Sequence, residues 1–171
     1  MNTDSFYFKL PIKSDYIVDY CLEVLDNWEG PPLEYLSATY VIPLYLEVLL
    51  EDTWIKELND KFPIKIAGLM KIEPFSYYHW HTDLERGVGI NMLLPFEGHS
   101  HCFFTPALRK NRINKFHELC YIPKSFYLFN TQKLHCVFNW KYPRYVFSLE
   151  FKKNKNDLTY EEVLEWVKKK T

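Results

Sequence analysis

Hydrophobic residues recur at helical spacing in much of the first third of the chain. A short strand is predicted at 5–10, where aromatic and polar residues mix, and Ser14 then opens a run with an apolar residue every three or four positions. The turn formers at 29–32 end this first helix. A second helix is predicted with Pro43 near its start and an end at 61–63. The apolar positions are Ile17, Val18, Cys21, Leu22 and Leu25 in the first helix, and Leu46, Leu49, Leu50 and Ile55 in the second.

From position 64 onward the pattern changes to short β-rich runs separated by turns. Eight strands without an intervening helix are typical of a jelly-roll, the double-stranded β-helix barrel of antiparallel strands, or of a related double-sheet barrel. The strands are expected at 64–73, 77–83, 88–94, 100–105, 117–122, 125–130, 134–140 and 144–151. A capping box at 159–162 then opens an amphipathic helix with lysines in its last turn. We expect a mainly β single domain over 1–171, with 64–151 as the jelly-roll core and flanking helices in 1–63 and 157–171.

Composition narrows the class of protein. Apolar residues make up 47% and charged residues 25% of the chain, which is typical of a packed soluble domain and excludes general disorder. Aromatic residues reach 18% while glycine occurs only 5 times, which favours strands over glycine-rich phosphate loops. The formal net charge is -1, so the overall charge implies no attraction to nucleic acid or to anionic lipid.

The sequence also bears on the compartment. Charged residues interrupt the first twenty positions, so we expect no secretory signal peptide. The longest apolar stretch, 41–50, contains Glu47 and is too short to cross a bilayer, so we expect no membrane span. The four cysteines lie far apart and form no C-x-x-C pair, which favours buried thiols in a reducing compartment, the cytoplasm. These are Cys21, Cys102, Cys120 and Cys136.

Two histidines and one aspartate are candidate metal ligands. His81 and Asp83 are two residues apart at the end of an aromatic strand, so both side chains are expected on the same face of that strand. His135 lies on a later predicted strand and can supply a third ligand. Two histidines and one carboxylate on one face of an octahedron are the ligand set of non-haem Fe(II) oxygenases.

Arg144 separates this hypothesis from a chance H-x-D pair. It lies nine positions after His135, at the head of the last predicted strand. An arginine buried in a barrel is costly unless it meets an anion, and its planar fork suits a carboxylate. Ser148 shares the face of Arg144 through the two-residue period and could add a hydroxyl hydrogen bond.

The order His81-x-Asp83, His135, Arg144 in a β-rich, helix-flanked context resembles the Fe(II)- and 2-oxoglutarate-dependent dioxygenases. It is most similar to the small phage and bacterial members related to prolyl and aspartyl/asparaginyl hydroxylases. The resemblance covers about 64–151, and the N-terminal helices look like those that buttress the major sheet in that family. It implies that His81, Asp83 and His135 are catalytic ligands of Fe(II). It also implies that Arg144 holds the C5 carboxylate of the cosubstrate 2-oxoglutarate.

Two further cosubstrate contacts follow from the same resemblance. Ser148 occupies a position similar to hydroxyl residues that bind the C5 carboxylate in some members. Asn91 begins the string Asn-Met-Leu-Leu-Pro, which is similar to a string found after the metal motif in small members. The activity implied is hydroxylation of a substrate, which the sequence does not identify, by O2, with release of succinate and CO2. The protein is expected in the cytoplasm, or in the host cytoplasm if a phage encodes it.

Several features keep less specific interpretations open. His79 shares the face of His81 and is better explained as a packing or rim residue than as a ligand, and His99 and His101 are better explained as strand surface. The basic loop 108–115 could bind phosphate or an acidic peptide, or simply be solvated. Two other functions therefore remain as alternatives: a non-catalytic metal- or ligand-binding jelly-roll, and an interaction module whose basic loop binds nucleic acid. Arg144 separates the oxygenase from a structural metal site, which has no need of a carboxylate anchor.

Overall fold

The computed structural model describes residues 4–29, 33–36, 39–97, 100–106 and 115–170. Eleven strands and four helices are assigned in these ranges. They are β1 (Tyr7–Lys9), α1 (Asp15–Asn27), β2 (Leu33–Leu36), β3 (Thr39–Leu44), α2 (Leu46–Leu49), α3 (Thr53–Lys61), β4 (Ile64–Ile72), β5 (Ser76–His81), β6 (Val88–Leu93), β7 (Ser100–Thr105), β8 (His117–Leu119), β9 (Phe126–Asn130), β10 (Leu134–Asn139), β11 (Arg144–Phe151) and α4 (Tyr160–Lys170).

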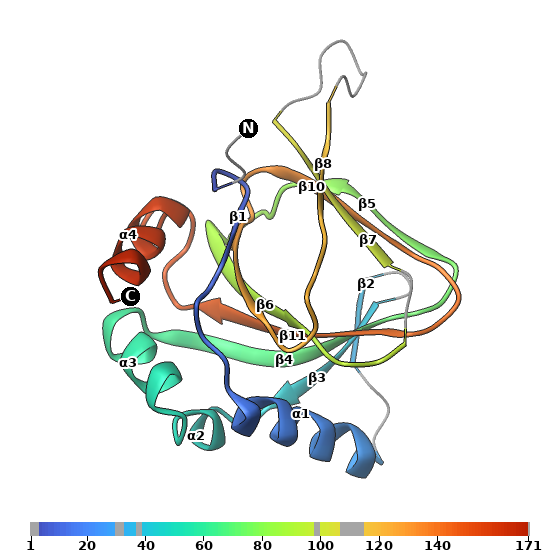
Figure 1. Ribbon diagram of the computed structural model, residues 1–171, viewed down its shortest axis with the longest axis horizontal. Coiled ribbons are helices and arrows are strands. Elements are labelled where there is room, and N and C mark those ends of the chain that lie inside the picture. Colours follow the sequence, from blue (N-terminus) through green and yellow to red (C-terminus); the bar gives the residue numbers. More distant parts are fainter. Residues whose placement is uncertain (1–3, 30–32, 37–38, 98–99, 107–114, 171) are drawn as a thin grey trace.

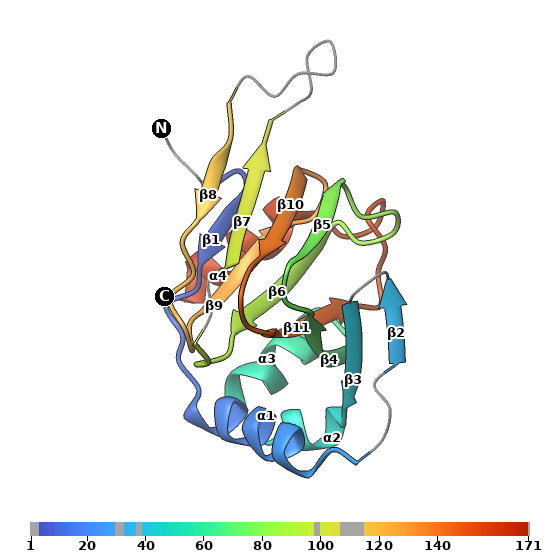
Figure 2. The ribbon, with the colours of Figure 1, turned by 90° about the vertical axis from the view of Figure 1, so that its right-hand side faces the viewer.

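The strands form two antiparallel sheets. The larger sheet has seven strands in the order β1-β9-β6-β11-β4-β3-β2, and the smaller has four in the order β5-β10-β7-β8. Figure 2 shows the smaller sheet beside the larger one. The expected mainly β architecture with flanking helices is therefore confirmed. The strand pairs of the described residues make two separate sheets and do not close into one barrel.

Helices cover one face of the seven-stranded sheet. α1, α2 and α3 lie along that face in Figure 1, and α4 lies at one end of the sheet. The core between helices and sheet is apolar and includes Ile17 and Cys21 of α1, Ile55 of α3, Tyr160 of α4 and Phe147 of β11. Burial of this face stabilises the fold, at about 25 cal/mol for each Å² of apolar surface removed from water.

Side-chain caps fix where the helices begin. Ser14 accepts a hydrogen bond from the Ile17 N–H at the start of α1, and Asp52 accepts one from the Ile55 N–H at the start of α3. The Ser14 hydroxyl also donates to the Asp52 carboxylate at 2.6 Å, which joins the two helix starts. The predicted capping box of α4 is confirmed by reciprocal bonds between Thr159 and Glu162.

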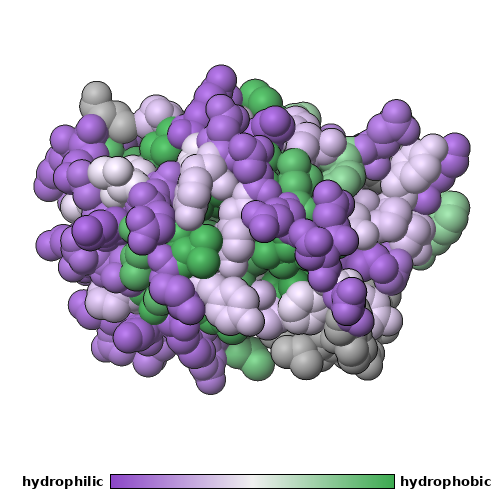
Figure 3. Space-filling view, turned by 90° about the horizontal axis from the view of Figure 1, so that it is seen from below, coloured by the Kyte–Doolittle hydropathy of each residue, from purple (hydrophilic) through white to green (hydrophobic). Residues whose placement is uncertain are grey.

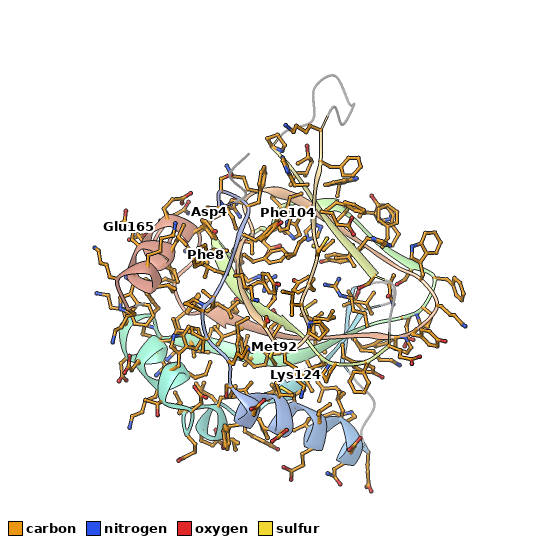
Figure 4. All side chains as sticks on the ribbon, in the orientation of Figure 1. Asp4, Phe8, Met92, Phe104, Lys124 and Glu165 are labelled. Carbon is orange, nitrogen blue, oxygen red and sulfur yellow. The ribbon has the colours of Figure 1, made fainter. Side chains whose placement is uncertain are left out.

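A second apolar cluster fills the space between the two sheets. It combines Phe104 of β7 and Val137 of β10 with Ile72, Tyr127 and Phe129 of the larger sheet. Phe104 is fully buried and lies between the sheets in Figure 4. This cluster fixes the separation of the sheets at one end, and the site described below lies beside it.

The prediction of a helix starting near Pro43 is wrong. Residues 39–44 form β3, in which Pro43 pairs with Gly68 of β4. The predicted helix is instead two helices, α2 and α3, separated at 50–52. The apolar residues of this segment fit both the helical period and the strand period. Pairing with the long strand β4 makes residues 39–44 a strand. β2, which pairs with β3, also had no clear signal in the sequence.

The strand boundaries after position 64 agree with the sequence to within a few residues, and all eight predicted strands are present as β4 to β11. None of the helices in the described ranges is long and apolar enough to span a membrane. Figure 3 shows the face seen from below in Figure 1, where α1 and α2 lie; hydrophilic side chains cover most of it, with hydrophobic ones in separate groups between them.

Candidate metal and cosubstrate site

The three predicted metal ligands lie together. His81 ends β5 and His135 lies in β10, and the register of these neighbouring strands pairs the two residues directly. The Asp83 Oδ1 atom is 3.6 Å from His81 Nε2 and 3.9 Å from His135 Nε2. One ligand atom from each residue can be chosen so that all three lie within 4.8 Å of one another. Since metal–ligand bonds are about 2.0–2.2 Å long, ligand atoms at such separations can share one ion with little movement.

The sequence predicted Asp83 at the end of the strand, but the structure places it beyond the strand. β5 ends at His81, and Asp83 lies in the following loop, where its N–H donates to the Thr131 carbonyl at 3.0 Å. This bond turns the chain toward the connection between β9 and β10. The prediction of one shared strand face is therefore wrong, although the carboxylate still reaches both imidazoles.

Backbone carbonyls set the orientation of both imidazole rings. His81 Nδ1 lies 2.6 Å from the His79 carbonyl oxygen, and His135 Nδ1 lies 2.8 Å from the Lys133 carbonyl oxygen. A carbonyl oxygen only accepts hydrogen bonds, so each Nδ1 must carry a proton and donate it. In the neutral ring this leaves the lone pair on Nε2, the atom that faces Asp83.

The buried ring of His135 is held in its neutral form. Burial is the main cause that lowers its pKa to about 4, and the neighbouring His81 lowers it further. The centres of the His81 and His135 rings are 4.2 Å apart, so two charged rings would repel strongly. A neutral imidazole is the form that binds a metal ion.

A cavity of about 60 Å³ extends from the two histidines into the space between the sheets. His81 and His135 line one part of it. Arg144, Asn91 and Ser148, the three residues predicted to hold a cosubstrate, also line it. Asn91 and Ser148 are register partners on the neighbouring strands β6 and β11. Five of the six predicted site residues thus line one cavity, and the sixth, Asp83, lies beside His81 and His135 on the side of a second, larger space.

Arg144 is buried without an anionic partner. Its exposed fraction is 5%, its guanidinium lies 5.1 Å from the centre of the Tyr121 ring, and no carboxylate in the described ranges forms an ion pair with it. The Nε atom has no hydrogen-bond partner among the described residues. A buried guanidinium in this state is costly unless an anion enters the cavity.

Two further polar side chains line the cavity together with Arg144. The Asn91 Oδ1 atom is buried and has no partner in the part of the chain that the structure describes. The Tyr121 hydroxyl is buried, which raises its pKa, and both Arg144 and a hydrogen bond with Asn91 act in the opposite direction. The phenol therefore stays protonated at neutral pH and can donate a hydrogen bond.

A larger cleft of about 810 Å³ opens on the other side of the metal ligands. Tyr78, His81 and Arg86 line both the cleft and the cavity, so the triad lies where the two spaces meet. The remaining residues that line the cleft are Lys65, Tyr77, His79, Thr82, Asp83, Leu84, Glu85 and Glu150. The volume is in the range of small-molecule sites.

Sequence reasoning missed two residues of the site. Tyr121 contacts Arg144, and no local pattern connects them. Arg86 donates to Asp83, and its three-residue spacing from that aspartate could have indicated the pair. The other predicted metal candidates do not join the triad: His79 is exposed at the rim of the cleft, and His101 pairs with Glu118 on the smaller sheet. His99 and 108–114 of the basic loop lie outside the described residues.

Comparison by sequence gives no relative: no family model matches the chain, and no curated protein matches it. Comparison by structure gives many. An oxidoreductase of the 2OG-Fe(II) oxygenase family from Burkholderia pseudomallei matches with a TM-score of 0.62 at 12% identity, over 92% of this chain and 88% of that chain.

Two prolyl hydroxylases match as well. The prolyl-4-hydroxylase of Pseudomonas putida has a TM-score of 0.58 at 10% identity, over 88% of this chain and 95% of its own. The prolyl hydroxylase of Trichoplax adhaerens, solved with a peptide fragment of hypoxia inducible factor, has a TM-score of 0.58 at 11% identity, over 85% and 81%. The chain therefore has the fold of the 2OG-Fe(II) oxygenases, and the resemblance seen in the sequence is confirmed for the fold.

Proposed function

We propose that this protein is an Fe(II)- and 2-oxoglutarate-dependent oxygenase that hydroxylates a substrate bound in the cleft, with release of succinate and CO2. One observation carries the proposal: a buried arginine without an anionic partner among the described residues lines the same cavity as the two histidines of a His-Asp-His triad. A structural metal site explains the triad but leaves the arginine unexplained. The two sheets would be the two walls of the double-stranded β-helix.

The donor set fits Fe(II). His81 and His135 present Nε2 lone pairs and Asp83 presents a carboxylate oxygen, which together are the two-histidine, one-carboxylate set that leaves other positions open. Fe(II) bound there would supply the redox chemistry that couples decarboxylation of 2-oxoglutarate to oxidation of a substrate C–H bond. The protein's part is to orient these three ligands and to keep bulk water out of the cavity behind them.

The cavity fits a dicarboxylate. Arg144 would bind the distal carboxylate with its planar fork, and Ser148 and Tyr121 would donate hydroxyl hydrogen bonds to the same end. Asn91 would contact the cosubstrate from the neighbouring strand. The acid at the other end would face His81 and His135, on the side where the cleft begins. Cosubstrate and substrate would thus reach the metal from opposite sides.

The thiols agree with a reducing location. All four cysteines are free, and three of them are buried. We propose the cytoplasm as the place of action, with O2, 2-oxoglutarate and a small molecule or protein side chain as the reactants.

Anaerobic addition of Fe(II) and 2-oxoglutarate tests the proposal. The wild-type protein should develop the weak visible charge-transfer band of a chelated iron complex, and succinate should form when O2 is admitted together with a substrate. His81→Ala should abolish both signals. His101→Ala is the matched control, because this histidine pairs with Glu118 outside the site and should leave both signals unchanged.

The outcomes separate the competing functions. A folded wild-type protein that binds neither Fe(II) nor 2-oxoglutarate would contradict the oxygenase. Metal binding without any effect of 2-oxoglutarate would instead support the non-catalytic metal-binding jelly-roll. A band without succinate in the absence of substrate is compatible with the oxygenase, and a panel of candidate substrates then measures turnover.

A further inference from the structure

Asp83 is held by one of its two carboxylate oxygens. Arg86 Nε donates to Asp83 Oδ2 at 2.6 Å, a short, charge-assisted hydrogen bond. The other oxygen, Oδ1, is the one that lies closest to the Nε2 atoms of His81 and His135. The exposed fraction of the Asp83 side chain is 10% and that of Arg86 is 23%, so this contact is only partly screened by water.

The backbone of Arg86 is anchored as well. Its carbonyl oxygen accepts hydrogen bonds from Thr131 Oγ1 and from Gln132 Nε2, and Gln132 Nε2 also donates to the Asp83 carbonyl at 2.9 Å. The next residue, Gly87, is packed so closely that a Cβ there would collide with the Leu158 carbonyl oxygen. These contacts fix the backbone of Arg86, from which the guanidinium extends to Asp83.

We infer that Arg86 is a positioning residue that keeps Asp83 a one-oxygen metal ligand, by occupying Oδ2 so that Oδ1 alone faces the imidazoles. The inference rests on the metal centre of the proposed function and adds a residue to it. Partners of this kind orient a ligand and also leave metal positions open, since a carboxylate bound through both oxygens would take up an additional one. Arg86 lies between the cavity and the cleft, where those open positions would be needed.

Charge alone makes the opposite prediction. A guanidinium close to a metal site repels a cation, so removing it would raise the metal affinity if Arg86 acted only through its charge. If Arg86 acts by orienting Asp83, removing its hydrogen bond lowers the affinity instead. The sign of the change therefore distinguishes the two roles.

Two uncharged variants isolate the hydrogen bond. Arg86→Gln places an amide N–H at the position of Nε, whereas Arg86→Met places a methyl group there, with a stem of similar length. Titration with Co(II) alone, followed by its visible spectrum, should show an affinity about 10- to 100-fold lower for Arg86→Met than for Arg86→Gln. The Co(II) spectrum of Arg86→Met should also change, because the coordination by Asp83 changes. Lys65→Met is the matched control: Lys65 is another cation that lines the cleft, paired with Glu150, and its loss should not lower Co(II) affinity.

The melting temperatures of metal-free Arg86→Met and Arg86→Gln should be similar. Equal Co(II) affinities and equal spectra for the two variants would overturn the inference.

A crystal structure of the Co(II)-loaded wild-type protein is a second test that needs no variant. One Asp83 oxygen on the metal with the other on Arg86 supports the inference, and both oxygens on the metal overturn it. If the wild-type protein binds no Co(II), the proposed metal centre itself is contradicted. If it binds Co(II) and the two Arg86 variants have the same affinity, only the role of Arg86 is contradicted.

Discussion

The two faces of the seven-stranded sheet have different compositions, although the same strands build both. On β11, Phe147 and Leu149 point into the core under the helices, while Arg144 and Ser148 line the cavity between the sheets. On β6, Ile90 and Met92 lie in the helix-side core, while Asn91 lines the cavity. The two-residue period of a strand makes this separation possible.

The difference in composition shows that the two faces have different roles. The buried part of the helix-side face is apolar, and it supplies burial. The cavity-side face carries buried polar atoms without partners, namely Arg144 Nε and Asn91 Oδ1. Such groups cost stability in the protein without ligand, and the apolar face offsets this cost. Substitutions on the two faces should therefore affect different measured quantities.

The largest expected effect is on the helix-side face. Phe147→Ala removes a fully buried ring that packs edge-on against Phe126, and should lower the free energy of unfolding by about 3–5 kcal/mol. The affinity of the folded fraction for 2-oxoglutarate should not change. Urea denaturation followed by circular dichroism measures the stability. Phe138→Ala, which truncates a half-buried ring on the smaller sheet, should cost clearly less; an equal loss would contradict the division between faces.

The second-largest expected effect is on 2-oxoglutarate affinity, from a substitution on the cavity-side face. Arg144→Ala should weaken 2-oxoglutarate binding by about 30-fold or more, which corresponds to at least about 2 kcal/mol, because the bound carboxylate loses its buried partner. The affinity for Fe(II) or Co(II) and the free energy of unfolding should stay close to the wild-type values. Calorimetric titration of the Co(II)-loaded protein measures the first quantity. Equal losses of metal and 2-oxoglutarate would show that Arg144 is structural.

A smaller effect is expected at Ser148, four residues after Arg144 on the same strand face. Ser148→Ala removes one neutral hydroxyl, and the loss of its hydrogen bond to the bound carboxylate should cost about 1–1.5 kcal/mol. The dissociation constant for 2-oxoglutarate should rise about 5- to 10-fold, measured by the same titration. An unchanged constant would mean that Ser148 only packs against Asn91.

The smallest expected effect is on the alkylation rates of buried thiols on the two sides of the seven-stranded sheet. Burial raises the pKa of Cys21, in the helix-side core, and of Cys102, in the cavity wall, to about 12 each. Both stay protonated at pH 8 and should react slowly with thiol reagents, whereas the exposed Cys120 should react fast. Peptide mapping after timed alkylation measures each rate. Bound 2-oxoglutarate should slow the labelling of Cys102 without affecting Cys21, and equal protection would contradict a cosubstrate in the cavity.

Local patterns predicted the parts of this protein that depend on local geometry. The run of short strands after position 64, the capping box of α4 and the shared face of Arg144 and Ser148 all follow from spacing along one segment. The helix expected near Pro43 failed for the complementary reason. Its apolar residues satisfied more than one period, and the choice was made by β4, a partner that follows in the chain.

The sequence by itself determined which side chains could serve as ligands and that Arg144 and Ser148 share a strand face, because strand period and side-chain chemistry are local properties. Only the tertiary structure decided that β10 pairs with β5 in the register that sets His135 opposite His81. It also decided that Asp83 leaves the strand and is held by Arg86. Strand register and loop anchoring are set by contacts between segments far apart in the chain, and no spacing within either segment encodes them.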